Sequence, residues 1–218
     1  MHSGFSAPKK LPERIYVEKF EASPCHFHVN RQGKELEALI EKERTQLAKD
    51  LQVRLSKHVA PTVLLQQGEE PPAGPFWLLR GSFQIVEEGS RLLRAGIGLG
   101  LGKTVMKTEV QLINLSSLES DPVFLTIQTT GGSGMAPGAV AAFTPIGPFV
   151  LSNALINAGG SLGGALGSGI SIDRRRTARE IVAAISEYSA HHDLLPRTRA
   201  LHPKKLGKIP NFFDSNSY

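Results

Sequence analysis

A glycine-rich run in the middle of the chain carries the clearest suggestion of ligand chemistry. Gly102, Lys103 and Thr104 form the Gly-Lys-Thr sequence that ends a phosphate-binding loop, in which backbone N–H groups surround phosphate oxygens. The spacing excludes that loop, because it needs a glycine five positions before Gly102 and Ile97 stands there. The dinucleotide-binding fingerprint is also excluded, since the alternating residues after Thr104 predict a strand and not a helix N-terminus.

The same glycines recur with a period of two, which is the spacing of side chains on one face of a strand. A strand face without side chains lets a helix, another strand or another subunit approach closely. We therefore interpret four glycines as packing or assembly residues: Gly96, Gly98, Gly100 and Gly102. Nucleotide binding through Lys103 is the alternative hypothesis.

Cys25, His26 and His28 place three potential metal ligands within four residues. A zinc site needs a second pair of ligands at a defined spacing, and the other histidines are scattered along the chain. The sequence also lacks the His-Glu-x-x-His pattern of zinc hydrolases. We therefore expect no metal, no cofactor and no catalytic residues, and hence a protein that is not an enzyme.

A long segment between Asp121 and Asp173 contains no charged residue. Prolines break its first part, which argues against a continuous helix there, whereas residues 149–170 are free of proline and long enough to cross a bilayer. Two asparagines and many glycines disfavour a membrane helix, so we expect a buried or oligomer-facing segment, with membrane insertion and disorder as alternatives. Small-residue spacing makes five glycines candidate assembly residues: Gly159, Gly160, Gly163, Gly164 and Gly167.

Basic residues follow this segment in two groups. Arg174, Arg175 and Arg176 are candidates for contact with an anion such as a lipid phosphate, although a solvated turn would explain them as well. The second group lies near the C-terminus and lacks interleaved aromatic residues, which makes nucleic acid an improbable partner: Arg197, Arg199, Lys204, Lys205 and Lys208. The predicted partners are a second copy of the chain or an envelope protein, with a membrane surface as a further candidate.

The elements that must position these groups fit one α+β domain over residues 14–195, after a flexible arm over 1–13 and before an extended tail over 196–218. A chain of 218 residues with 40% hydrophobic residues is long enough for one core. Helical spacing of apolar residues predicts a helix over 34–58, and the capping-box spacing of Thr177 and Glu180 predicts a terminal helix. Both are expected to pack on a mainly antiparallel sheet. Strands are predicted near residues 15–20, 61–67, 76–86, 91–114 and 123–129.

Five segments in this order carry a resemblance to a known family: residues 15–20, 79–83, 88–102, 129–138 and 176–181. They resemble a bacterial family known only as a domain of unknown function, many of whose members look like envelope lipoproteins. The resemblance implies a sandwich-like α+β domain, similar to the amino-terminal domain of the Tol-system translocation protein or to the curli-secretion lipoprotein, which forms a ring.

The family also implies a location in the bacterial envelope, in the periplasm or at the inner leaflet of the outer membrane, with a leader and a lipidated cysteine before the mature chain. The first residues lack the pattern of a signal peptide and no apolar run precedes Cys25, so the cytoplasm stays open as a location. The sequence therefore predicts a non-catalytic, envelope-associated binding or assembly protein. The alternative is an intracellular nucleotide-binding or nucleic-acid-binding protein that uses Lys103 and the basic tail.

Overall fold

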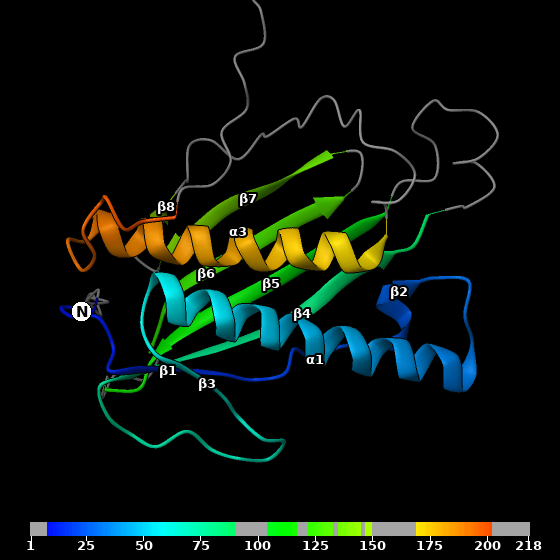
Figure 1. The fold of residues 1–218 in the computed structure, drawn as a ribbon, viewed down its shortest axis with the longest axis horizontal. Coiled ribbons are helices and arrows are strands. Elements are labelled where there is room, and N and C mark those ends of the chain that lie inside the picture. The colour runs from blue at the N-terminus through cyan, green and yellow to red at the C-terminus, as the bar shows by residue number, and fades with distance from the viewer. Residues whose placement is uncertain are drawn as a thin grey trace, which may run out of the picture.

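Two helices lie side by side on one face of a mixed sheet and run in the same direction (Figure 1). The structure, a computed structural model, describes residues 8–89, 104–116, 122–132, 135–144, 147–149 and 169–201. Its eight-stranded sheet has the order β3-β1-β4-β5-β6-β7-β8, and β2 pairs with β4 outside this path. The elements are β1 (Arg14–Val17), the 3₁₀ turn η1 (Pro24–His26), β2 (Phe27–His28), α1 (Gly33–His58), β3 (Thr62–Leu64), β4 (Phe76–Glu87), β5 (Val105–Asn114), β6 (Val123–Gly132), β7 (Met135–Thr144), β8 (Gly147–Phe149) and α3 (Ile170–His191).

Helix α1 confirms the helix predicted over residues 34–58. Its buried positions include Leu47, Leu51 and Leu55, whose spacing of four residues forms one apolar stripe against the sheet. The helix ends at His58, where the N–H of Val59 still donates to the carbonyl of Leu55 at 2.8 Å. The amphipathic pattern alone is therefore sufficient to locate this element.

Helix α3 begins at Ile170, about two turns before the predicted capping box, so the predicted start of the terminal helix is wrong. Gly169 occupies the N-cap position, and Thr177 is fully buried inside the helix instead of capping it. Residues 174–176, for which a solvated turn was considered, lie within α3 because the helix begins before them. Packing of the first turns of α3 against α1 supplies the stability that local capping would otherwise provide.

The central strands confirm the predicted antiparallel core of the sheet. Strand β4 pairs with β5 along its whole length, and β5 pairs with β6. Strand β5 covers the described part of the strand predicted over residues 91–114. Thr108 and Thr129 face the helices from these strands, are 1% exposed, and join their hydroxyl groups at 2.7 Å.

The sheet is mainly antiparallel as predicted, but it also contains parallel pairs that were not predicted: β1 with β3, β1 with β4, and β2 with β4. Parallel neighbours need a crossover connection, and α1 provides it between β1 and β3. Strands of three and four residues are too short to show their direction in the sequence pattern. The sheet is therefore mixed, with mostly antiparallel pairs.

Strands β7 and β8 were not predicted, because their Gly, Ala and Pro residues have low strand propensity. Proline lacks the N–H group that a central strand needs, and it is tolerated at bulges and edges. Pro137 lies where the register of β6 and β7 shifts, and Pro148 lies in β8, the last strand in the sheet order. Both prolines therefore occupy positions compatible with a strand.

Strand β3 forms the other end of this order, and α1 side chains bind its outward-facing backbone. The N–H of Thr62 donates to the hydroxyl oxygen of Ser56 at 3.1 Å. The side-chain amide of Gln52 donates to the carbonyl oxygen of Thr62 at 3.4 Å. Helix α1 thus packs over β1 and β3 and also binds the outward-facing backbone of β3.

Candidate functional site

Part of the sheet side opposite the helices is polar, and a second apolar cluster around Tyr16, Leu65, Leu78 and Ile113 occupies another part. Along residues 106–112 of β5 and 125–129 of β6, buried side chains alternate with exposed or half-exposed polar ones, and Arg80 and Ser82 of β4 lie on the same side as these polar residues. Arg80 donates two hydrogen bonds to the side-chain oxygen of Gln111, at 3.2 and 3.1 Å, and the amide of Gln128 donates to Glu109 at 3.1 Å. We call this surface the open face, defined by Arg80, Ser82, Glu109, Gln111, Thr126 and Gln128.

A pocket of about 280 Å³ lies on the open face, next to the segment that follows β1. Two glutamates of that segment, Glu18 and Glu21, complete its lining together with open-face residues from β4 and β5. The residues lining this open-face pocket are Glu18, Glu21, Arg80, Gly81, Ser82, Glu109 and Gln111. The pocket therefore combines segments that lie far apart in the sequence.

Backbone hydrogen bonds attach this segment to β4. The N–H of Glu18 donates to the carbonyl of Leu79 at 3.0 Å, and the N–H of Glu21 donates to the carbonyl of Gly81 at 2.8 Å. The N–H of Phe83 in turn donates to the carbonyl of Glu21 at 2.9 Å. These main-chain hydrogen bonds fix the backbone of Glu18 and Glu21, so both side chains are attached at defined positions beside the open face.

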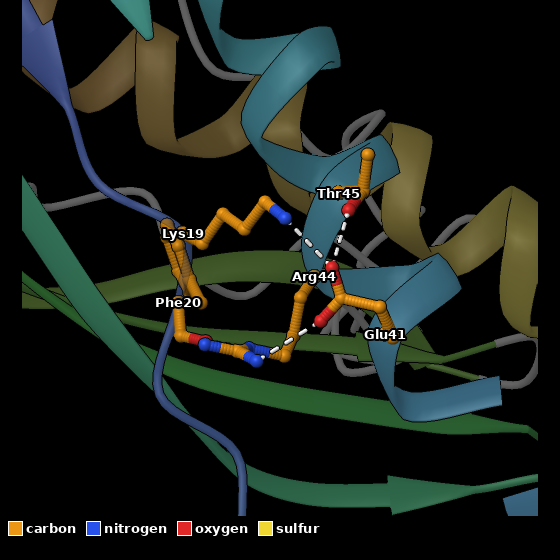
Figure 2. Close-up of polar contacts among 5 residues, drawn as sticks. All are labelled: Lys19, Phe20, Glu41, Arg44 and Thr45. Carbon is orange, nitrogen blue, oxygen red and sulfur yellow. Dashed lines mark hydrogen bonds and ion pairs between the residues drawn. The ribbon is translucent and has the colours of Figure 1, made fainter. Parts of the chain in front are cut away.

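Helix α1 holds the same segment from the other side of the sheet, as Figure 2 shows. Lys19 donates to one oxygen of Glu41 at 2.7 Å, and Arg44 donates to the other at 3.0 Å. Thr45 also donates to Glu41 at 3.1 Å, and Arg44 reaches the carbonyl oxygen of Phe20 at 2.6 Å. These hydrogen bonds, above all the one from Lys19, hold the pKa of Glu41 below its usual value.

Gly81 lets the segment approach β4 closely. A Cβ atom at this position would lie 2.7 Å from the ring of Phe20 and 2.6 Å from the backbone oxygen of Glu109. Both distances are far shorter than a normal van der Waals contact, and Phe20 is fully buried. The aromatic ring thus fills the space that the missing side chain leaves, and the pocket wall depends on glycine here.

The open-face pocket is negatively charged at neutral pH. Three carboxylates, Glu18, Glu21 and Glu109, face one guanidinium, Arg80, which gives a net formal charge of −2. Partial burial raises the pKa of Glu18, Arg80 opposes this shift, and the charge of Glu21 adds to it. Carboxylates accept short, charge-assisted hydrogen bonds from ammonium and guanidinium groups. The pocket is therefore suited to a cationic group.

The nine glycines predicted to serve assembly lie outside the described residues, and Lys103 does too. The predictions made for them, including packing within an oligomer, therefore stay predictions. The same holds for nearly all of the segment considered for membrane insertion. In the parts of the chain that the structure describes, none of the helices combines the length and the apolar character needed to cross a bilayer.

Arg174 faces α1 and not an external anion. Its side chain is 6% exposed and donates to Glu43 at 2.9 Å and to Asp50 at 3.0 Å. Burial disfavours the guanidinium cation, but the bonds to Glu43 and Asp50 outweigh this cost and raise the pKa of Arg174. Arg175 is exposed and Arg176 is half-exposed, so anion contact stays a prediction for these two residues.

The Cys25, His26 and His28 group is spread over η1 and β2. Cys25 is exposed and its sulfur lies 3.1 Å from the hydroxyl of Ser23, while Nδ1 of His26 lies 2.8 Å from the carbonyl oxygen of Phe83. Among the described residues, no cluster of three or more His, Cys, Asp or Glu side chains has the arrangement of a metal site.

The open-face pocket is not indicated by any single motif of the sequence. Its residues come from three segments between positions 18 and 111, and the pairing of β1 with β4 and of β4 with β5 brings them together. The alternation of polar and apolar residues along β4 and β5 was the available signal. It indicates a half-exposed sheet but does not show which exposed residues share a pocket.

Comparison with solved structures finds distant likenesses. PelC from Paraburkholderia phytofirmans, determined as a dodecamer, is 12% identical, with 60% of this chain and 78% of PelC covered and a TM-score of 0.31. A neuraminyllactose-binding hemagglutinin homologue from Helicobacter pylori is 10% identical, with 65% of this chain and 75% of that protein covered and a TM-score of 0.33.

No curated protein matches the chain. The sequence model described as "Domain of unknown function (DUF4410)" matches residues 15–147, which is more than half of the chain and includes every residue that lines the open-face pocket. The match also confirms the resemblance to a family known as a domain of unknown function. The chain belongs to the DUF4410 family.

Proposed function

We propose that this protein is a non-catalytic binding or assembly domain whose partner docks on the open face. The observation that carries the proposal is the construction of the open-face pocket. Backbone hydrogen bonds to β4 fix Glu18 and Glu21. Glu41 and Arg44 of α1 bind the same segment from the helix-covered side of the sheet. A pocket held in this way loses little conformational freedom when a partner binds.

The two sides of the sheet support the same proposal. Helices α1 and α3 cover one side, whereas no helix of the described residues covers the open face. An antiparallel sheet can expose one face to water, and a solvated surface is the simplest alternative. A pocket of about 280 Å³ with a net negative charge distinguishes this face from an evenly polar one.

We further propose that the protein acts in the bacterial envelope and that its Gly-rich segments contribute to self-association or lie against a membrane. The resemblance to envelope lipoproteins supports the location. The alternating glycines from Gly96 to Gly102 and the uncharged segment support close packing between surfaces. Fractionation of bacterial cells that make the natural full-length protein tests the location directly.

Site-specific photo-crosslinking in such cells tests docking on the open face. A photoreactive residue at Gln111 should form a discrete adduct with a partner or with a second copy. The matched control is the same residue at Glu37, an exposed position on α1. An additional Glu109→Lys substitution should reduce the adduct at Gln111 at least fivefold. Equal adducts at both positions, or none at Gln111, would contradict the proposal.

A further inference from the structure

The chain contains a basic segment whose charge complements the open-face pocket. Five basic residues lie between positions 197 and 208, and no acidic residue stands between Asp193 and Asp214. Arg197 and Arg199 are exposed. The pocket has a net formal charge of −2, so this segment and the pocket attract each other at neutral pH. Lysine and arginine are also the side chains that three neighbouring carboxylates can bind through charge-assisted hydrogen bonds.

The basic segment starts on the opposite side of the sheet from the pocket. The N–H of Leu201 donates to the hydroxyl oxygen of Ser186 at 2.9 Å, and this hydroxyl lies 3.0 Å from the carbonyl of Leu201. Ser186 belongs to α3, which packs on the helix-covered side (Figure 1). These bonds fix the start of the segment in the helix layer, with the sheet between it and the pocket.

Chain length makes the pocket of the same copy difficult to reach. Lys204 and Lys205 follow Leu201 by three and four residues, a span of about 10–14 Å in a fully extended chain. The pocket lies on β4 and β5, which are separated from the β3 edge by β1 and β3. A path round that edge must pass strands spaced about 4.8 Å apart and a helix-on-sheet thickness of about 10 Å. The path round that edge therefore exceeds the span available to Lys204 and Lys205.

We infer that the basic segment of one copy, residues 197–208, docks in the open-face pocket of a second copy. This inference rests on the function proposed above and names the partner. The basic segment, which starts beside α3 of one copy, then contacts the open face of the next copy, so the two contact surfaces differ. Such a heterologous contact repeats from copy to copy and produces a ring if the rotation closes or a filament if it does not.

A charge-exchange experiment on the full chain tests this contact. One variant carries Glu18→Lys and Glu21→Lys, and the other carries Lys204→Glu and Lys205→Glu. In sedimentation velocity at low salt, the wild-type chain should associate, while each variant alone should show at least a tenfold weaker association because like charges meet. A mixture of the two should associate again, since each basic segment then meets an acidic pocket and each acidic segment meets a basic one.

The control carries Lys34→Glu and Lys49→Glu, two exposed positions of α1 with the same change of charge. It should associate like the wild type. A wild-type chain that stays monomeric at all concentrations, or a mixture that stays dissociated while both variants are folded, would overturn the inference. One outcome is that Glu109→Lys abolishes the crosslinked adduct at Gln111 while Lys204→Glu with Lys205→Glu leaves association unchanged. In that case the basic segment is not the occupant of the pocket, and the proposed function stands. If neither substitution matters, both proposals fail.

Discussion

Arg174 of α3 and Glu43 of α1 form an ion pair of 2.9 Å in which both side chains are almost completely buried. The same guanidinium also reaches Asp50, two helical turns further along α1. One arginine therefore links two positions of the neighbouring helix and fixes the register of α1 against α3.

Removal of this arginine should destabilise the fold strongly. Arg174→Ala leaves the Glu43 carboxylate buried without its cationic partner, which typically costs about 3–5 kcal/mol. The free energy of unfolding in urea, followed by the fluorescence of the buried Trp77, measures the loss. Arg175→Ala at the exposed neighbouring position is the control and should change stability by less than about 0.5 kcal/mol. Equal effects of the two substitutions would show that the ion pair contributes little.

Gly81→Ala should damage both stability and the open-face pocket. The added Cβ would lie 2.6 Å from the backbone oxygen of Glu109 and 2.7 Å from the Phe20 ring, so the strands or the ring must move. Overpacking of this kind costs about 1–3 kcal/mol. Urea unfolding measures the cost, with Ser82→Ala as the neighbouring control. An unchanged stability of Gly81→Ala would show that the segment after β1 is not held against β4.

The buried hydroxyl pair of Thr108 and Thr129 should show strong coupling. Thr108→Val leaves the Thr129 hydroxyl buried without its partner, which costs about 1–3 kcal/mol, and Thr129→Val should act in the same way. The double substitution removes both polar groups and should cost much less than the sum of the two. A double-mutant cycle of unfolding free energies measures this coupling, and simple additivity would contradict it.

Glu18→Gln should stabilise the protein at neutral pH and not under acid conditions. Partial burial raises the pKa of Glu18 above its ordinary value of 4.5 in the folded state, so the folded protein loses stability as the pH rises through the window just above 4.5. Glutamine cannot ionise and avoids this loss. Unfolding free energies of both proteins at pH 3.5 and pH 7 measure the effect, which should disappear at the lower pH.

Glu41→Gln, on the helix that holds this segment, should have the opposite effect on stability. The pKa of Glu41 is lowered, so its contribution is present above pH 4.5 and is lost as the pH falls through the folded-state pKa. This substitution should therefore destabilise at pH 7 and have little effect in acid. The effect should stay below about 1 kcal/mol, because the side chain is 51% exposed and water screens its ion pairs. The same sign for both glutamates would contradict these assignments.

Local sequence patterns were sufficient to predict α1 and the central strands, because a helical apolar stripe and the alternation of a strand are visible within a short stretch of sequence. The start of α3 was missed since Arg174 finds its stabilising partners on α1, more than a hundred positions earlier in the chain. Strands β7 and β8 were missed because their composition suits a loop and only pairing with β6 and with each other makes them strands.

The candidate site depends on tertiary contacts to a greater extent than the helices and central strands do. Glu18 and Glu21 become pocket residues only because β1 pairs in parallel with β4, and nothing in their immediate sequence indicates that pairing. Gly81 lay within one of the segments that carried the family resemblance, but its role depends on Phe20, sixty-one positions away. A pattern in one short segment cannot contain this information.

The hydrogen bonds of Ser56 and Gln52 to Thr62 bear on how copies of this protein can join. An exposed strand with unpaired backbone groups is a template for uncontrolled aggregation, and α1 removes that template at Thr62 by occupying both of its backbone groups. Growth of a continuous intermolecular sheet, as in amyloid, is therefore blocked at this position. The self-association proposed above would gain from this protection, since the subunits would then meet through side chains and not by indiscriminate strand addition.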